Sequence, residues 1–235
     1  MTGSRSKAGA TRSAAAKLRA AAALSLTREK RAPMAKTMRA TVLFADLRGY
    51  TALAERMEPK RILPLLDEFF TLLSGAAGLH GGRVFHMAGD GMMAGFGVSE
   101  AAGFGASDAL AAGHAMLQEF AAVALRWRRE LSLEAGIGVG LHLGEVALGS
   151  IGPPGRKRIT LVGDTVNVAA RLCSRARAGE VLLSCTVADA LGTRPVGAHG
   201  AVRSVPFLQL TQFELRGRSA PLDIWCIPAA ERLAL

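Results

Sequence analysis

The sequence has few cysteines, few aromatic residues and no long uncharged apolar run. Its three cysteines, Cys173, Cys185 and Cys226, form no Cys-x-x-Cys pair, which argues against a zinc site or a disulfide framework and suits a cytoplasmic location. No apolar stretch of about 18 residues is free of charges, and even the Ala-rich run 101–125 contains Asp108. We therefore expect no transmembrane segment.

Acidic residues are almost absent from the first 40 residues. This tail carries ten Lys and Arg residues against Glu29 alone, a net charge of +9, whereas the rest of the chain has a net charge of +1. The total of +10 is typical of nucleic-acid-binding proteins, but here it belongs to the tail. We expect residues 1–38 to form a basic Ala-rich leader, flexible or partly helical, and residues 39–230 to form the folded domain. No specific nucleic-acid partner is indicated.

Apolar periodicity in the body predicts a mixture of strands and helices. Pro59 suits a helix start, and Pro64 inside the same pattern should kink that helix or shift its beginning. Antiparallel hairpins combined with helices predict an α+β fold, a ferredoxin-like sandwich with a mostly antiparallel sheet and helices packed on one face. The expected elements are a strand at 40–45, a hairpin of 83–87 with 92–96, a helix at 100–129 and a second hairpin of 134–143 with 145–151 around Gly144.

Two acidic residues each lie where a strand ends in a tight turn. Asp46 follows the apolar run 40–45, and Asp90 lies between Gly89 and Gly91. Either residue alone is explained as a turn former. If their strands are neighbours, the two carboxylates converge, which is unfavourable unless a cation lies between them. Hard divalent ions with oxygen ligands suit such a pair, and two ions can activate an attacking hydroxyl and neutralise a leaving phosphate.

An amide and a guanidinium share one face of a later helix. Asn167 and Arg171 are four residues apart, shortly after Gly163-Asp164, so their side chains are neighbours. An Arg beside an amide can bind a phosphate through paired hydrogen bonds. A solvated helix face with an incidental Arg would explain the pair as well. Asn is a poor residue for a helix interior, which favours the functional interpretation.

These three motifs, in this order, resemble the catalytic domain of class III nucleotidyl cyclases, the adenylate and guanylate cyclase family. The resemblance covers about residues 38–228, and no single piece of it is specific. It is carried by Phe-Ala-Asp-x-x-Gly-Tyr-Thr at 44–51, Gly-Asp at 89–90, the glycine-rich stretch 142–152, Gly-Asp-x-Val-Asn-x-Ala-x-Arg-Leu at 163–172 and Leu-Arg-Gly at 215–217.

The resemblance implies a homodimer that binds ATP at composite active sites with two divalent cations, Mg²⁺ or Mn²⁺. Asp46, Asp90 and the Leu47 carbonyl would hold the cations. From the other subunit, Asn167 would orient the ribose and Arg171 would stabilise charge on the α-phosphate. The reaction would be in-line attack of the 3′-hydroxyl on the α-phosphate with release of pyrophosphate.

The residues that would read the base depart from the family pattern. Adenylate cyclases of this family have Lys, and guanylate cyclases Glu, where this chain has His86, and the usual partner position holds Thr160. A His donor and a Thr acceptor match N1 and N6 of adenine, which favours ATP over GTP. His86 could instead be an ordinary strand residue. Arg216 or Arg218 would contact the terminal phosphates.

The sequence thus predicts a cytoplasmic, metal-dependent adenylate cyclase. Two alternatives stay open: a guanylate cyclase, and a nucleotide-binding regulatory dimer that has lost turnover through the change at His86. A third alternative, a nucleic-acid-binding protein driven by its basic tail, predicts steeply salt-dependent binding that disappears when residues 1–38 are deleted.

Overall fold

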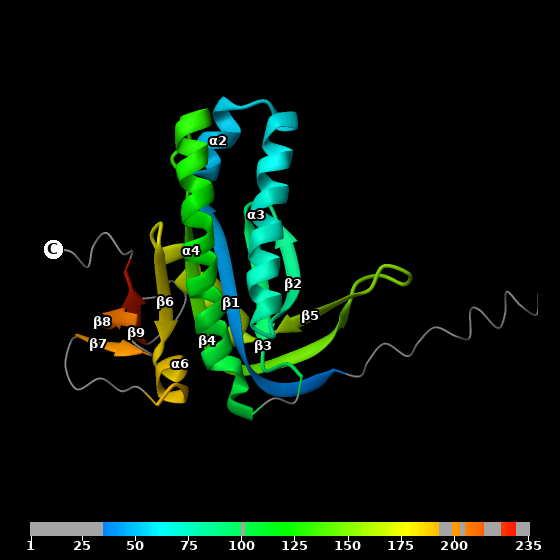
Figure 1. Cartoon of the computed structure of the whole chain (residues 1–235). Helices are drawn as coiled ribbons and strands as arrows, with labels where there is room; N and C mark the ends of the chain where they lie inside the picture. Colours follow the sequence, from blue (N-terminus) through cyan, green and yellow to red (C-terminus); the bar gives the residue numbers. More distant parts are fainter. Residues whose placement is uncertain (1–34, 100–101, 193–198, 203–204, 214–221, 229–235) are drawn as a thin grey trace, which may run out of the picture.

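A mostly antiparallel sheet runs through the centre of the protein, with helices packed against it (Figure 1). The computed structural model describes residues 35–99, 102–192, 199–202, 205–213 and 222–228. The elements are β1 (Lys36–Arg48), α2 (Tyr50–Arg56), α3 (Pro59–Leu79), β2 (Arg83–Ala88), β3 (Gly91–Phe96), the 3₁₀ helix η1 (Ala102–Gly105), α4 (Ala106–Leu131), β4 (Gly136–Ile151), β5 (Arg158–Val162), α5 (Asp164–Arg175), β6 (Glu180–Ser184), α6 (Cys185–Ala190), β7 (His199–Val202), β8 (Val205–Phe213) and β9 (Leu222–Ile227).

Within the described residues the sheet follows the order β2-β3-β1-β4-β6-β9-β8-β7, and β5 pairs with the outer part of β4. Strands β4 and β6 run parallel, and the other pairs are antiparallel. The predicted α+β fold and the β2–β3 hairpin are thereby confirmed. Strand β1 is longer than predicted and begins at Lys36, inside the segment expected to be leader.

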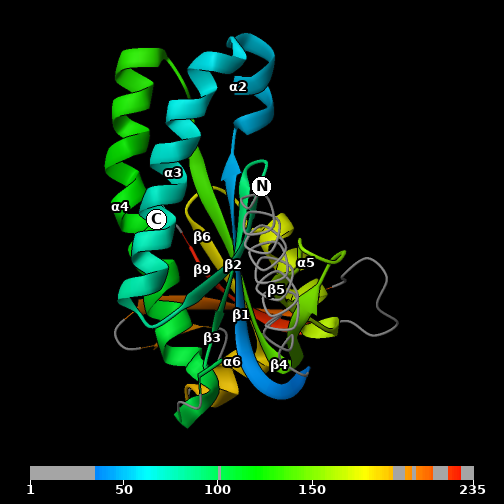
Figure 2. The same ribbon diagram turned by 90° about the vertical axis from the view of Figure 1, so that its right-hand side faces the viewer.

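Helices cover both faces of this sheet, whereas the sequence predicted helices on one face. Successive residues of a strand point to opposite faces. Along β1, Leu43 and Ala45 pack in the main core with α3 and α4, while Val42 packs in a second cluster with Ala169 of α5. Figure 2 shows α3 and α4 on one side of the sheet and α5 on the other. The sheet therefore separates α5 from the two long helices.

Helix α3 begins at Pro59, as predicted, and remains helical through Pro64, so this proline neither ends nor delays the helix. Its buried Phe69 meets Phe120 of α4 edge-on with 5.6 Å between ring centroids, and Phe120 meets Trp127 in the same way at 5.4 Å. Among the described residues, α3 is also the one helix long and apolar enough to cross a membrane. Its packing against α4 and the sheet accounts for its apolar face.

Strand β4 is continuous from Gly136 to Ile151, so the predicted second hairpin around Gly144 is wrong. Gly144 lies within the strand and pairs with Ala40 of β1. A Cβ atom on Gly144 would lie 2.4 Å from Thr165 Oγ1 at the start of α5. Glycine is required here because α5 approaches β4 closely, and no turn is involved.

The same close approach explains two further glycines of β4. A Cβ on Gly140 would lie 2.1 Å from the Cys173 amide nitrogen and 2.4 Å from the Ala169 carbonyl oxygen, and a Cβ on Gly138 would lie 2.8 Å from the Ala176 carbonyl oxygen. Alternate residues of a strand share a face, so Gly138 and Gly140 lie on the same face as Gly144, and each allows the backbone at the C-terminal half of α5 to approach β4 closely. The position of α5, and of the residues it carries, follows from this packing.

We predict that Gly140→Ala lowers the free energy of unfolding by about 1–3 kcal/mol or more, because the added methyl group meets backbone atoms that cannot move independently. Urea unfolding followed by circular dichroism measures the change. The matched control is Gly75→Ala on the exposed side of α3, where nothing lies within 4 Å of the added Cβ. That variant should be as stable as the parent or up to about 1 kcal/mol more stable. Parental stability of Gly140→Ala would contradict the packing described for α5.

Candidate active site

The carboxylates of Asp46 and Asp90 are brought together by the pairing of β1 with β3. Asp46 stands opposite Gly91 in the register of the two strands, and the Leu47 amide donates a 3.0 Å hydrogen bond to the Asp90 carbonyl. Gly89 has a φ of 60°, a conformation that glycine adopts without strain, and it allows the tight turn before Asp90. The strand that leads to Asp90 is β2, which is separated from β1 by β3, so the two acids are brought together through the strand that follows Asp90.

Electrostatics at this pair favour a bound cation. The pKa of Asp46 is raised above its ordinary value, first because the carboxyl is partly buried and second because of the charge of Asp90; Arg48 opposes both effects. An ionised carboxylate that is destabilised by burial and by a like charge is relieved by a cation between the two acids. The donor set, two carboxylates with backbone carbonyls nearby, suits the hard divalent ions Mg²⁺ and Mn²⁺.

No cluster of three or more His, Cys, Asp or Glu side chains that could enclose a metal ion occurs in the part of the chain that the structure describes. A site with two carboxylates leaves several coordination positions for water and for substrate phosphates, which is the usual arrangement for Mg²⁺ bound together with a nucleotide. The residues present therefore fit such ions. The Leu47 carbonyl as a further ligand stays a prediction.

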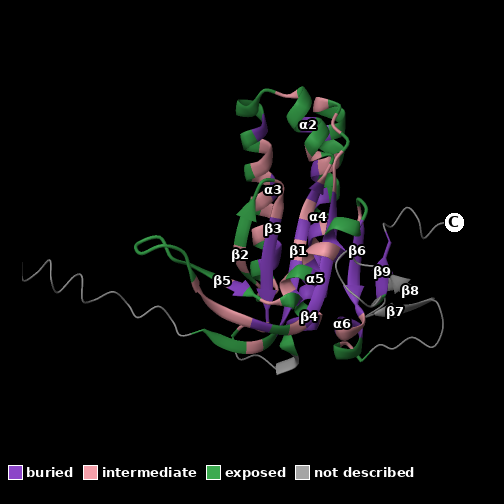
Figure 3. Cartoon of the chain, turned by 180° about the vertical axis from the view of Figure 1, so that it is seen from behind, coloured by how far each residue is buried: buried purple, intermediate pink, exposed green. Residues whose placement is uncertain are grey.

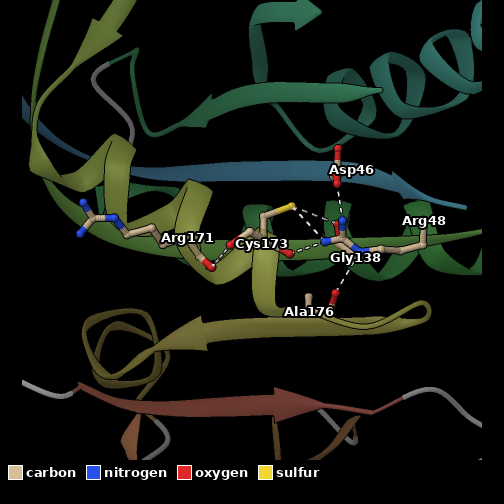
Figure 4. A network of polar contacts seen from close by, with 7 residues as sticks. Asp46, Arg48, Gly138, Arg171, Cys173 and Ala176 are labelled. Atoms are coloured by element: carbon tan, nitrogen blue, oxygen red, sulfur yellow. Dashed lines mark hydrogen bonds and ion pairs between the residues drawn. The ribbon is translucent and has the colours of Figure 1, made fainter. Parts of the chain in front are cut away.

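Arg48 is a site residue that the sequence analysis missed (Figure 4). Its guanidinium forms an ion pair with Asp46 and donates to the backbone carbonyls of Cys173 and Ala176, the latter at 3.0 Å. Asp46 and Arg48 are two residues apart on one strand, so their side chains point to the same face. This spacing was the available signal, but nothing in the sequence shows that α5 lies opposite.

Asn167 and Arg171 lie on α5, as predicted, with the Asn167 side chain exposed and that of Arg171 partly exposed. Figure 4 shows the Arg171 side chain extending along α5 away from Asp46. Within one chain, the structure therefore brings the two acids together and leaves the amide and guanidinium pair separate from them.

The proposed base-reading residues lie on two strands that contact each other, His86 on β2 and Thr160 on β5. His86 is exposed and follows an irregularity in the β2–β3 pairing, and Thr160 is half-buried opposite Gly149 of β4. Arg216 and Arg218, the predicted phosphate contacts, lie outside the described residues.

Comparison with known families agrees with these motifs. A family model described as the adenylate and guanylate cyclase catalytic domain matches residues 32–225. Among curated relatives, an adenylate cyclase of Anabaena cylindrica is 33% identical in an alignment of 148 residues that covers 59% of this chain and 27% of that protein. Adenylate cyclase 1 of Rhizobium meliloti (strain 1021) is 28% identical in an alignment of 193 residues that covers 79% of this chain and 27% of that protein. The chain thus spans a minor part of the length of these relatives.

Solved structures with the same fold include cyclases for both purine nucleotides. The adenylyl cyclase CyaB from P. aeruginosa superposes with a TM-score of 0.73 at 28% identity, covering 84% of this chain and 98% of that one. The guanylyl cyclase Cya2 gives a TM-score of 0.71 at 28% identity, covering 86% of this chain and 98% of that one. Because both kinds of cyclase match equally well, the preference for a base has to be argued from the site residues.

We predict that Asp90→Asn lowers the pKa of the Asp46 carboxyl, because it removes the neighbouring negative charge. In the parent protein the folded-state pKa lies above the ordinary 3.8, so the folded state binds more protons than the unfolded state between these two values. The contribution of Asp46 to stability therefore falls as the pH rises through this window. In Asp90→Asn the folded-state pKa of Asp46 lies closer to its ordinary value, so the pH range over which this contribution is lost becomes narrower.

A ¹³C NMR titration of the Asp46 side-chain carboxyl measures this shift without added metal. Asp67→Asn, which removes an exposed acid on α3, is the control and should leave the pKa of the Asp46 carboxyl unchanged. An unchanged Asp46 pKa in Asp90→Asn would show that the two carboxyls do not interact.

Proposed function

The chain belongs to the adenylate and guanylate cyclase catalytic-domain family, and we propose that it is a metal-dependent adenylate cyclase that acts as a homodimer. It would convert ATP to 3′,5′-cyclic AMP and pyrophosphate. The observation that carries the proposal is the convergence of Asp46 and Asp90 at the end of β1, where burial and the charge of Asp90 make Asp46 more costly to ionise. A pair of carboxylates arranged in this way is suited to the divalent cations that accompany a nucleoside triphosphate.

Asp46 and Asp90, with the Leu47 carbonyl, would hold two divalent cations, Mg²⁺ or Mn²⁺. When bound, these ions would favour deprotonation of the 3′-hydroxyl and neutralise charge on the phosphates. The chain's own contribution is geometric: the β1–β3 register brings the two acidic residues together, so that both carboxylates would lie on one side of the nucleotide. Positioning of this kind accounts for much of the catalysis of phosphoryl transfer.

Asn167 and Arg171 would act on the sugar and the α-phosphate. Asn167 would hydrogen-bond to the ribose and keep O3′ in line with the bond to be broken. Arg171 would stabilise the charge that develops on the α-phosphate. A bond from O3′ to the α-phosphorus forms, the bond from that phosphorus to the pyrophosphate oxygen breaks, and the hydroxyl proton is released. Arg216 or Arg218 would bind the terminal phosphates.

The need for a second copy of the chain follows from the direction of Arg171. Its side chain extends away from Asp46 of the same chain, so a complete site would combine the acids of one protomer with the Arg171 of its partner. Exposed apolar side chains support such an interface. Ile151, Ile159 and Val162 are exposed on the β4–β5 ribbon, which projects from the body (Figure 3).

ATP is the proposed substrate because of the pairing that His86 and Thr160 offer. Adenine presents an acceptor at N1 and a donor at N6, which His86 as a donor and Thr160 as an acceptor would match. Contact between β2 and β5 supports joint action of the two residues. Guanine presents donors at N1 and N2 and would call for a carboxylate, so GTP is the second candidate.

The exposed His86 also favours a different function, a nucleotide-binding regulatory dimer with little or no turnover. In that case the base would be bound loosely, and the acids would hold a metal–nucleotide complex without productive alignment. Chromatographic identification of the products from ATP and from GTP, each with Mn²⁺, separates the candidates. Tight binding without a cyclic product would favour the regulatory dimer.

We predict that Asp46→Ala and Asp90→Ala each lower cyclic-nucleotide formation by about 10²-fold or more, because each removes a ligand that positions charge against the phosphates. Circular dichroism should show that both variants remain folded. Asp67→Ala on the exposed side of α3 is the matched control and should keep parental activity. Full activity in either acid variant would refute the metal-binding role of that acid.

We predict that His86→Glu shifts the product ratio from cyclic AMP toward cyclic GMP by about tenfold or more, because a carboxylate leaves adenine N1 without a donor and accepts from guanine N1 and N2. The assay supplies ATP and GTP at equal concentrations and quantifies both cyclic products. An unchanged ratio would mean that His86 does not contact the base.

A further inference from the structure

The Arg48 side chain links the acidic half of the site to the helix that carries its basic half. It is the last residue of β1, and Figure 4 shows its guanidinium lying between Asp46 and the C-terminal end of α5. One nitrogen pairs with Asp46, and the other two donate to α5-end carbonyls of Cys173 and Ala176. The planar fork of arginine is thus used on two elements at once, which a lysine side chain cannot reproduce.

A glycine makes room for this link. Gly138 of β4 pairs with Asp46 of β1, and a Cβ atom on it would lie 2.6 Å from Arg48 Nη2 and 2.8 Å from Arg48 Nε. The Cys173 thiol donates to the Gly138 carbonyl at 3.3 Å, and burial raises the pKa of this thiol to about 12. The thiol therefore stays protonated and helps to seat α5 against the same glycine.

Arg48 also fixes the orientation of the Asp46 carboxylate. It holds Oδ2, while Oδ1 lies toward the hairpin, since a Cβ on Gly91 would be only 3.4 Å from it. The ion pair between Oδ2 and Arg48 therefore fixes the direction of Oδ1, which lies on the side of Asp90. Groups that orient a metal-binding carboxylate in this way affect cation affinity strongly.

At its other end, Arg48 completes the C-terminus of α5. The last carbonyls of a helix have no partners within the helix, and cations are favourable there. Cys173 and Ala176 are both buried. The Cys173 carbonyl accepts from the Ala176 amide at 3.1 Å as well as from Arg48, and the Ala176 carbonyl accepts from Arg48 Nε. Asn167 and Arg171 lie in the preceding turns of the same helix, and their placement depends on how that helix is anchored.

We propose that Arg48 is a positioning residue that holds the Asp46 carboxylate and α5 in one fixed relation, and that it thereby couples the two composite centres of the dimer. The inference rests on the proposed function. Only in a dimer with composite sites do Asp46 and Arg171 of one protomer serve different centres. A disturbance of Arg48 in one protomer then affects both centres, one through the carboxylate and the other through the helix.

The first test is Arg48→Lys, which keeps the positive charge but replaces the planar guanidinium, with its several N–H donors, by a single ammonium group. Mn²⁺ binding, measured by electron paramagnetic resonance without nucleotide, should weaken about tenfold to a hundredfold. In steady-state kinetics, kcat should fall by a similar factor, with KM for ATP changed less than about threefold, as expected when alignment is lost and ground-state binding is kept. Arg56→Lys, an exposed arginine at the end of α2, should match the parent in both measurements.

The second test places Arg48→Lys in one protomer of a mixed dimer. A protomer with Asp90→Ala and one with Arg171→Ala form a dimer with a single intact centre, which uses the acids of the second protomer and α5 of the first. We expect Arg48→Lys to lower kcat of this centre in either protomer. If Arg48→Lys lowers kcat only when it is placed in the Arg171→Ala protomer, Arg48 acts on Asp46 alone. That result would overturn the proposed coupling between the two centres.

Failure of this inference is distinguishable from failure of the proposed function. If Asp90→Ala and Arg171→Ala protomers restore no activity when mixed, composite sites are refuted, and the coupling between centres is refuted with them. If mixing restores activity but Arg48→Lys leaves Mn²⁺ binding and kcat at parental values, the positioning role is refuted while the composite site stands.

Discussion

The structure depends on two like charges held close together by strand pairing. Asp46 and Asp90 are far apart in the sequence, but the β1–β3 register places Asp46 opposite Gly91 and ties Leu47 to Asp90. Burial and mutual repulsion raise the pKa of Asp46, which is a stable arrangement only with positive charge nearby. Arg48 supplies part of that charge from within the chain. Divalent cations would supply the rest together with the nucleotide.

A second constraint fixes the other half of the site. Glycines at three positions of β4, Gly138, Gly140 and Gly144, leave no side chain where α5 and its two ends approach the strand most closely. This packing orients α5 so that Arg171 extends away from the acids of its own chain. In the proposed cyclase, a complete phosphoryl-transfer site would therefore combine residues of two protomers, and the catalytic residues of one chain would be divided between two centres. Arg48 contacts both Asp46 and the end of α5. It therefore connects the acid pair held by the β1–β3 register to the helix held by its packing on β4.

The sequence predicted the elements that local patterns determine. The apolar run before Asp46, the Gly-Asp turn and the helix bearing Asn167 all occur where expected. The second hairpin was wrong because Gly144 was interpreted as a turn, when it is needed for the contact with Thr165. The placement of α5 on the opposite face and the contacts of Arg48 depend on residues more than 100 positions apart. Local patterns carry no information about such contacts.

The most direct test of the account is a crystal structure with Mn²⁺ and an ATP analogue that cannot cyclise, with the metal located by anomalous scattering. The account predicts metal peaks bound by both Asp46 and Asp90 of one protomer, with Arg171 of its partner on the α-phosphate. Nucleotide bound with metal peaks away from these carboxylates, or with Arg171 of the same chain on the phosphate, would contradict it.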